Sequence, residues 1–318
     1  MLSACGDYLR QLSAEVGACW ERFWFTPRNP GWLGMIRLLT GCVALYWYLG
    51  YAGNLIEWFG PTGIVTPELL NNWHGGRSYI SLFAWSQDPN MLWGLYAAGL
   101  LCVAAMTVGW QANWTTPLAT LFVISLLQRG PLYSGPGEDV LAFVLVYLCI
   151  GNSGATWSVE RWLAKDAEHA KNSNGNVPDN RPIPASCCVW HHAQPTIRTN
   201  LAVRLLQVHF AMYCFAMALA QLGFENHWWS GIALWGLVTR VDSRWVDLTG
   251  IRDYPVLLNF WTHAVVIWEL ATALVWWPRL RPLLVALGVI LWGSLAVAGG
   301  MIVWPAMMII ASLSFLED

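Results

Sequence analysis

Eight predominantly apolar stretches, most of them close to 20 residues long, constrain the fold of this chain more than any other feature of its sequence. A helix needs about 20 apolar residues to cross a bilayer, and an open strand cannot cross, because lipid offers its backbone no hydrogen-bond partners. We therefore predict an all-α polytopic transmembrane helix bundle of about eight spans, seven to nine because the fourth and the last two stretches are short. The predicted spans are 33–53, 91–110, 114–133, 138–152, 199–223, 255–277, 282–299 and 301–316.

The composition agrees with an environment of lipid. Hydrophobic residues make up 56% of the 318 residues and charged residues 11%, whereas soluble domains carry about 25% charged residues. The 23 Trp outnumber the 17 Lys and Arg, and indole rings collect where hydrocarbon meets lipid headgroups. A net charge of −2 supplies no basic surface for a phosphate backbone. We expect a multi-pass integral membrane protein that contacts lipids and binds no nucleic acid.

Polar segments divide the chain into predicted units. The first unit is amphipathic, with Leu9, Leu12, Val16 and Trp20 on one side, which is typical of a helix lying on the membrane surface. A polar, proline-broken segment separates the two groups of spans, and such segments are flexible linkers. The units are an N-terminal interfacial segment at 1–30, an N-terminal transmembrane half at 31–164 with an ordered outer loop at 54–90, a flexible linker at 165–198 and a C-terminal transmembrane half at 199–318.

The basic residues of the loops predict the orientation, because Lys and Arg are in excess on the cytoplasmic side. If the N-terminus is inside, ten Lys or Arg lie on the inner side and five on the outer side, which favours both termini in the cytoplasm. The outer loops would then gather many aromatic side chains, a surface suited to a partner subunit or an amphipathic ligand. These residues are Trp58, Trp73, Trp85, Trp228, Trp229, Trp235 and Trp245.

Polar side chains inside the spans are candidate functional residues, because a charge in hydrocarbon is costly unless it is paired or faces water. The fifth span places several of them at spacings of three and four, so that they share one helix face directed into the bundle. A packing seam of small residues is the alternative. We predict that Glu269 pairs with Arg204 or Arg37, since an arginine keeps its charge and needs an anionic partner. The face consists of Arg204, Gln207, Ala211, Cys214, Ala218 and Gln221.

Three further side chains in the spans suggest a cofactor. His209 and Tyr213 lie four residues apart in the fifth span, and together with His263 they are candidates to ligate a haem or hold a quinone. The alternative is that each histidine is a hydrogen-bonded core residue. Glu138 and Asp139 are expected to cap the start of the fourth span, where carboxylates satisfy free backbone N–H groups. A proton relay is the alternative role for these two carboxylates.

Sharp catalytic and metal-binding motifs are missing from the sequence. It contains no Walker motif, no nucleophile elbow, no HExxH and no GxGxxG. The polar stretch CCVWHH brings together Cys187, Cys188, His191 and His192, but adjacent cysteines rarely bind one zinc ion and no CxxC spacing is present. We therefore expect a solvated linker here and no metal site.

Several motifs, taken in order, resemble one known family. They are RNPGWLGMIRLLTGCVALYW, FGPTGIVTP, LVYLCIGNSGATWSVERWL, NLAVRLLQVHFAMYCFAMALAQLG, WWSGIALWGLV, WELATALVWWPRLRP and the late GGM. Together they resemble the HTTM (horizontally transferred transmembrane domain) proteins, bacterial multi-span relatives of vitamin K-dependent γ-carboxylase. The resemblance covers about residues 20–316. It implies a helical domain of the bacterial inner membrane, related to an enzyme that uses reduced vitamin K, oxygen and carbon dioxide to carboxylate glutamates.

The resemblance also implies which chemistry is lost. The family places a basic lysine in a Lys-Leu pair, where this chain has Gln221 before Leu222, and an amide cannot accept that proton near neutral pH. A family histidine before the fourth span is replaced by Glu138 and Asp139, and a histidine of the penultimate span by Trp292. Residues on the family pattern that are kept, and that are expected to shape a quinone or lipid cavity, are Arg204, Gln207, Trp229, Gly231 and Glu269, with Trp228 beside them.

Three functions remain open. The first, which we favour, is a membrane scaffold or accessory subunit of a larger assembly, without γ-carboxylase activity and with a bound quinone or lipid. It would meet partner subunits on the outer face or in the membrane. The second is an enzyme of altered chemistry on a quinone or lipid, in which Glu138, Asp139 or Glu269 replaces the lysine. The third is a transporter or channel, for which the sequence shows neither internal repeats nor broken helices.

Overall fold

The computed structural model of the protein describes residues 2–75, 81–84, 87–130, 135–160, 162–163, 194–241 and 245–316, and side chains of the first helix from residue 10. Most of the predicted linker 165–198 lies outside these residues, as do Trp85, Cys187, Cys188, His191 and His192. The regular structure of the described residues is helical, which confirms the predicted all-α fold.

The helices follow the predicted spans. They are α1 (Leu2–Phe25), α2 (Gly31–Leu49), α3 (Leu55–Phe59), α4 (Pro67–Trp73), α5 (Pro89–Val108), α6 (Ala112–Arg129), α7 (Pro136–Ile150), α9 (Ile197–Phe224), α10 (Asn226–Trp229), α11 (Trp235–Val238), α12 (Pro255–Ala271), α13 (Arg281–Gly299) and α14 (Val303–Leu313), with 3-10 turns η1 (Leu82–Ala84), η3 (Ser153–Ala155), η4 (Thr249–Asp253) and η5 (Thr272–Leu274).

Local sequence explains where the long helices begin and end. Asp88 caps α5 by accepting a hydrogen bond from the backbone nitrogen of Met91 at 3.0 Å, and Thr196 caps α9 by accepting from Thr199 at 3.2 Å. Both side chains satisfy backbone N–H groups that the first helical turn leaves free. Gly109 ends α5 with φ of 75°, a left-handed conformation that glycine adopts without steric cost.

Five helical segments are long and apolar enough to cross a membrane. They are α2, α5, α9, α13 and the segment Pro255–Leu274, which joins α12 to η5. The protein is therefore an integral membrane protein. Three other predicted spans are helical but fall short of this length or of this hydropathy. Among these, α7 has 15 residues, which at about 1.5 Å per residue is roughly 22 Å, less than the ~30 Å hydrocarbon core.

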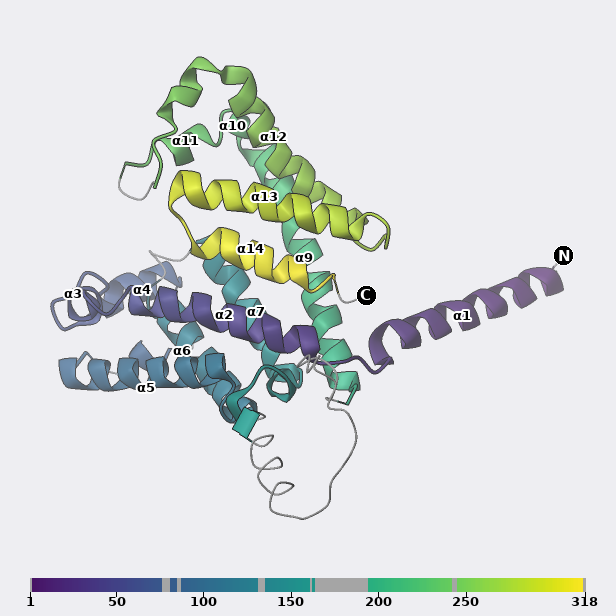
Figure 1. The fold of residues 1–318 in the computed structure, drawn as a ribbon, viewed down its shortest axis with the longest axis horizontal. Coiled ribbons are helices and arrows are strands. Elements are labelled where there is room, and N and C mark those ends of the chain that lie inside the picture. The colour runs from purple at the N-terminus through teal and green to yellow at the C-terminus, as the bar shows by residue number, and fades with distance from the viewer. Residues whose placement is uncertain are drawn as a thin grey trace, which may run out of the picture.

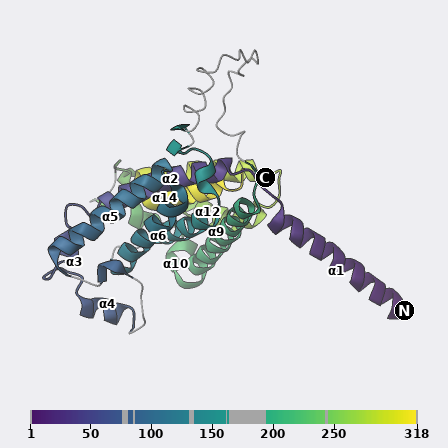
Figure 2. The same cartoon turned by 90° about the horizontal axis from the view of Figure 1, so that it is seen from below.

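The long helices form two layers (Figures 1 and 2). One layer runs α5, α2, α14 and α13, and each of these helices packs against the next. The other layer runs α6, α7, α9 and α12, again with each helix packed against its neighbour. The α5–α6 and α12–α13 pairs close the two ends, and α7 and α14 pack together across the middle. The short helices α3 and α4 lie at the left of Figure 1 and α10 and α11 at its upper left, away from the C-terminus.

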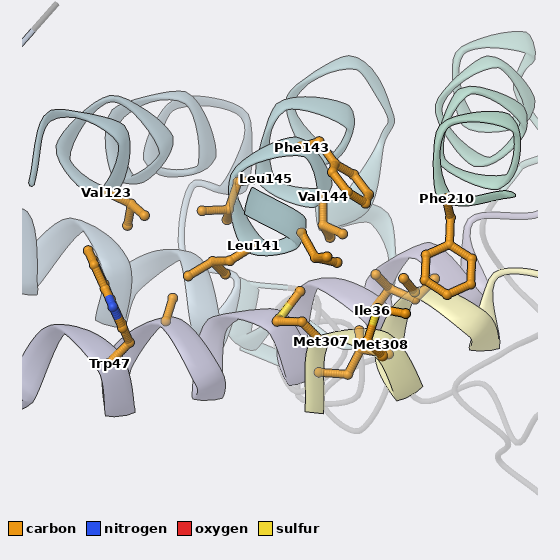
Figure 3. Packing of buried hydrophobic residues seen from close by; sticks show 14 of the residues in the cluster. Ile36, Trp47, Val123, Leu141, Phe143, Val144, Leu145, Phe210, Met307 and Met308 are labelled. Carbon is orange, nitrogen blue, oxygen red and sulfur yellow. The ribbon is translucent and has the colours of Figure 1, made fainter. Parts of the chain in front are cut away.

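The core lies where the two layers meet at α7. Figure 3 shows Leu141 and Val144 of α7 above Ile36 of α2 and above Met307 and Met308 of α14. All five side chains are fully buried. Close van der Waals packing between side chains holds helices together in lipid, because lipid is itself apolar and provides no hydrophobic driving force between them. The short helix α7 thus packs against α2, α6, α9 and α14, while its side chains Val146 and Ile150 remain exposed.

Helix α1 projects away from the bundle and touches it only near its C-terminal end (Figures 1 and 2). The predicted apolar side is exposed, with exposed fractions of 43% for Leu12, 59% for Val16 and 61% for Trp20. The Asn200 side chain on α9 holds the end of α1 by donating to the carbonyl oxygens of Phe23 and Trp24 at 2.9 and 2.8 Å. A helix thus covers Leu2–Phe25 of the segment predicted at 1–30. The structure leaves its apolar side uncovered.

Candidate functional site

The predicted polar face of α9 points into the bundle. At its N-terminal end, Arg204 donates to Gln207 Oε1 at 2.9 Å, and its guanidinium lies 4.5 Å from the centre of the Phe23 ring. Gln207 is fully buried and donates in turn to the backbone carbonyl of Ser314 at 2.7 Å. These contacts join α1, α9 and the end of α14. The members of the face that are buried are Gln207, Cys214, Ala218 and Gln221.

At the other end of this face, two buried polar side chains meet. Gln221 Nε2 donates to Glu269 Oε1 on α12 at 3.4 Å. Glu269 is 0% exposed and Gln221 5% exposed. The remaining oxygens of the pair, Gln221 Oε1 and Glu269 Oε2, are buried and have no hydrogen-bond partner in the described part of the chain. The sequence identified both residues as site candidates but did not indicate that they touch each other.

The predicted ion pair between Glu269 and an arginine is not formed, so that prediction was wrong. Gln221 lies nearly five turns, about 25 Å at a rise of ~1.5 Å per residue, beyond Arg204 on the same helix. Arg37 is buried, and its two terminal nitrogens donate to the carbonyl oxygens of Ser153 and Trp157 at 2.7 and 2.5 Å. The arginines are held by amide and carbonyl groups, which leaves the carboxyl of Glu269 with an amide as its neighbour.

His209 and Tyr213 face α7 and do not meet His263. His209 Nδ1 lies 2.7 Å from the Tyr147 hydroxyl, and the ring stacks on Phe143 with centroids 4.3 Å apart. The Tyr213 hydroxyl donates to the carbonyl oxygen of Pro136 at 3.0 Å. His263 lies on α12 against α13. His209 and Tyr213 are thus half-buried and hydrogen-bonded to residues of α7, whereas His263 lies at the groove between α12 and α13.

Glu138 has the capping role that the sequence predicted. Its carboxylate Oε2 accepts a hydrogen bond from the backbone nitrogen of Gly135 at 2.9 Å, just before α7 begins. This satisfies a backbone N–H that has no intrahelical partner, and a carboxylate at this end of a helix is also stabilised by the helix dipole. The next residue, Asp139, is exposed.

A groove of about 490 Å³ lies between α12 and α13. Its walls are almost wholly apolar, with Phe260 and Ile267 contributed by α12 and Leu287 and Ile290 by α13. These side chains are 71%, 64%, 47% and 70% exposed, so the groove opens toward the lipid. Sequence periodicity could not reveal it, because two helices must pack before their side chains enclose a groove.

His263 brings a polar group to this apolar groove. Its Nδ1 lies 2.7 Å from the carbonyl oxygen of Asn259. A carbonyl oxygen can only accept a hydrogen bond, so Nδ1 carries the proton, and in the neutral ring Nε2 is then an acceptor. Beside it, Trp261 Nε1 donates to Ser294 Oγ at 3.0 Å and joins the two helices. The groove therefore offers an acceptor nitrogen within an otherwise hydrocarbon-like wall.

Of the tryptophans predicted to lie in outer loops, Trp73, Trp229 and Trp245 are exposed, whereas Trp58, Trp228 and Trp235 are half-buried. Trp229 is 64% exposed, although its Nε1 donates to the carbonyl oxygen of Leu222 at 2.6 Å, and Trp228 Nε1 donates to Glu225 Oε2 at 2.9 Å. Each indole N–H is thus satisfied while the ring of Trp229 stays on the surface, which suits the boundary between hydrocarbon and water.

Trp292 is a core residue. It is 0% exposed, and its ring lies 5.6 Å from that of Trp268 and 5.2 Å from that of Trp304. The Trp292 indole nitrogen has no hydrogen-bond partner in the described residues. Indole fills space here between α12, α13 and α14, where the resemblance places a histidine.

A second, more polar hollow of about 620 Å³ lies at the start of α6 and the end of α7. Asn113, Asn152, Thr196 and Arg198 line it, and none of them belongs to the predicted site. The Gln221–Glu269 pair and the α12–α13 groove, in contrast, both contain predicted site residues.

Metal binding finds no support within the described ranges, which contain no cluster of three or more His, Cys, Asp or Glu side chains placed to share an ion. The candidate residues Cys187, Cys188, His191 and His192 lie outside those ranges. Comparison with known proteins gave no matching family model, no matching curated protein and no matching solved structure. Function must therefore be argued from the geometry of the chain itself.

Proposed function

We propose that this protein is an HTTM-type membrane protein without γ-carboxylase activity, which serves as a scaffold or accessory subunit of a larger assembly and holds a quinone or lipid. The observation that carries the proposal is the groove of about 490 Å³ between α12 and α13. Its size falls in the range of roughly 300–1,000 Å³ that small-molecule sites occupy. The apolar walls suit an alkyl or isoprenoid chain, and His263 Nε2 offers an acceptor for a hydroxyl group on that chain.

The absence of carboxylation is supported by the chemistry of Gln221. This residue takes the place at which the resemblance puts a basic lysine, and a side-chain amide does not take up a proton near neutral pH. Its Nε2 donates to Glu269, so the group at this position is a neutral donor. A strong base is required to deprotonate a hydroquinone at this place, and the described neighbours of Gln221 provide no lysine.

Exposed indoles support a role in an assembly. Trp73 at the end of α4, Trp229 at the end of α10 and Trp245 after α11 are 58%, 64% and 63% exposed. Tryptophan is enriched in protein interfaces because it combines a large apolar surface with a polar N–H. A partner subunit that covers these rings would remove apolar surface from water at the end of the bundle away from the C-terminus.

The proposal includes the position of α1 and of the two termini relative to the membrane. The exposed apolar side of α1 would lie in the interfacial layer of the bilayer, as amphipathic helices do. The chain enters α2 and leaves α14 at the same end of the bundle (Figure 1). This arrangement supports both termini on one side, the cytoplasmic side of a bacterial inner membrane by the loop charges.

The test is to isolate the protein with its surrounding membrane and to identify what accompanies it. The protein is extracted with a membrane-solubilising polymer, and the bound lipids and quinones are compared by mass spectrometry with those of the same membrane. We expect one amphipathic molecule with a hydroxyl group, or its quinone form, to be enriched in stoichiometric amount, together with one or more partner subunits. Bound lipids and quinones with the same composition as the surrounding membrane, together with a chain that carries no partner subunit, would contradict the proposal.

The alternative is an enzyme of altered chemistry, for which the carboxyls of Glu138, Asp139 and Glu269 are the candidates. The specific observation in its favour is that Glu269 is buried with one oxygen unpartnered. The wild-type protein is assayed with vitamin K hydroquinone and carbonate beside a Gln221→Lys variant. Turnover by the wild type would favour the enzyme. Epoxide formation by the variant alone would support the loss of the base as the reason for inactivity.

A further inference from the structure

Glu269 is a carboxyl group buried in a candidate membrane span without a cation. Its side chain makes one hydrogen bond, to Gln221 Nε2, and no Lys or Arg of the described residues forms an ion pair with it. An ionised carboxylate in such a place would carry the full cost of a buried, unpaired charge, which is several kcal/mol in a membrane. One amide N–H at 3.4 Å is a weak partner for that charge.

The charged and titratable groups on the neighbouring elements do not change this balance. Tyr213 and Cys214 of α9 lie within electrostatic range of Glu269, and both are neutral or negative, so neither stabilises a negative charge. Arg281, at the start of α13, donates through Nε to the carbonyl oxygen of Val275. On α9 the remaining groups are Arg198 and Arg204, toward its N-terminal end, and His209, whose ring contacts the Tyr147 hydroxyl of α7. The other groups are His227 of α10, Arg252 and Asp253 of η4, all three exposed, and His263 of α12 itself, which lines the groove.

The unpartnered atoms of the pair are complementary if one proton is added. Gln221 Oε1 and Glu269 Oε2 are both buried acceptors, and no described residue donates a hydrogen bond to either. A proton on Oε2 turns that oxygen into an O–H donor, and Gln221 Oε1 is the acceptor that belongs to the same pair. Amide and acid then form a ring of two reciprocal hydrogen bonds, in which Gln221 Nε2 donates to Glu269 Oε1 and Glu269 Oε2 donates to Gln221 Oε1.

We propose that Glu269 is a proton-binding site inside the membrane, in which the neutral carboxylic acid is held by Gln221 as a cyclic acid–amide pair. The proton satisfies two buried oxygens at once and removes the unpaired charge. This inference concerns the α9–α12 contact and does not depend on what the α12–α13 groove binds. It also explains why a glutamine serves at this position, since its amide donates and accepts in the same plane.

Infrared spectroscopy of the purified full-length protein in lipid at neutral pH tests the proposal. Protonated carboxylic acids have a C=O stretching band that ionised carboxylates lack. We expect such a band in the wild type and expect Glu269→Gln to remove it. Glu138→Gln and Asp139→Asn, which change the other carboxyls near α9, should leave it in place. If the spectrum of Glu269→Gln differs from that of the wild type only by the loss of carboxylate bands, the proposal is overturned.

Two changes at Gln221 keep the test decisive should Glu269→Gln fail to fold. Gln221→Leu takes away the acceptor of the O–H, and the band should move to higher frequency, as it does for a free carboxyl. Gln221→Lys places a cation beside Glu269, and the band should disappear, because the carboxyl then ionises. An unmoved band in Gln221→Leu would show that the proton is not shared with Gln221 and would likewise overturn the pair.

Discussion

The amide of Gln221 on α9 and the carboxyl of Glu269 on α12 lie 3.4 Å apart, both buried, and form the polar contact between the two helices at this depth. Gln221, which stands where the resemblance would place a lysine, therefore contacts Glu269, which lies on the family pattern. A lysine at position 221 would have stood against the same carboxyl. A glutamine and a lysine at position 221 would therefore contact the same carboxyl but differ in protonation chemistry.

Removing the amide should weaken the bundle. In Gln221→Leu the carboxyl of Glu269 loses its hydrogen-bond donor, and an unsatisfied buried polar group costs about 1–3 kcal/mol. We expect a lower Tm in detergent and no change in span topology. Leu219→Ala, at a position 52% exposed to lipid on the same helix, is the control and should change the stability by less than ~0.5 kcal/mol. Equal Tm values for Gln221→Leu and the wild type would show that the contact is not stabilising.

Arg37 fixes the segment after α7 to α2. Its two terminal nitrogens donate to the carbonyl oxygens of Ser153 and Trp157. In Arg37→Met both carbonyls lose their donor, so we expect about 1–3 kcal/mol of destabilisation and faster proteolysis between Ser153 and Glu160. Arg37→Lys keeps the charge but cannot reach two carbonyls with a planar fork, so its proteolysis rate should be intermediate. A lysine variant identical to the wild type would show that charge alone is required.

Close approach of α2 and α5 depends on Gly41. A Cβ added there would lie 2.9 Å from the Thr107 Cα, which is backbone and cannot move aside. Gly41→Ala should therefore lower stability by about 1–3 kcal/mol, the usual cost of overpacking. Gly94 of α5 has open space around its added Cβ, and Gly94→Ala should raise stability by roughly 0.5–1 kcal/mol through helix propensity. Thermal unfolding of both variants distinguishes steric closeness from a general intolerance of alanine.

Much of the fold was predictable from residue pattern alone. Each of the eight predicted spans is a helix, because long apolar runs leave the backbone no other way to satisfy its hydrogen bonds in lipid. The buried face of α9 was likewise predicted, since spacings of three and four fix which side chains share a face. Membrane crossing by each short helix could not be predicted, because the position of a helix such as α7 depends on its packing against α2, α6, α9 and α14.

The pairing of polar groups was less predictable. Charge complementarity led to the expectation of a contact between Glu269 and Arg204 or Arg37, yet helix register placed Gln221 beside Glu269. Which residues on two helices meet depends on their crossing and on side-chain volume, neither of which is visible in one helix's periodicity. The groove beside His263 was hidden for the same reason, because its walls come from two helices.

The most direct test of the account is native mass spectrometry of the wild type and of His263→Leu. Each protein is extracted with the same polymer from membranes of the same host. His263 lines the groove between α12 and α13, and leucine keeps the wall apolar while removing the acceptor nitrogen. We predict that the wild type carries one hydroxyl-bearing lipid or quinol per chain and that His263→Leu loses at least about tenfold of that occupancy, the equivalent of ~1.4 kcal/mol. Ser294→Ala, which removes the hydroxyl that Trp261 contacts, should retain more than His263→Leu. A wild-type chain without a bound molecule, or a His263→Leu variant with undiminished occupancy, would contradict the assignment of the groove as the binding site.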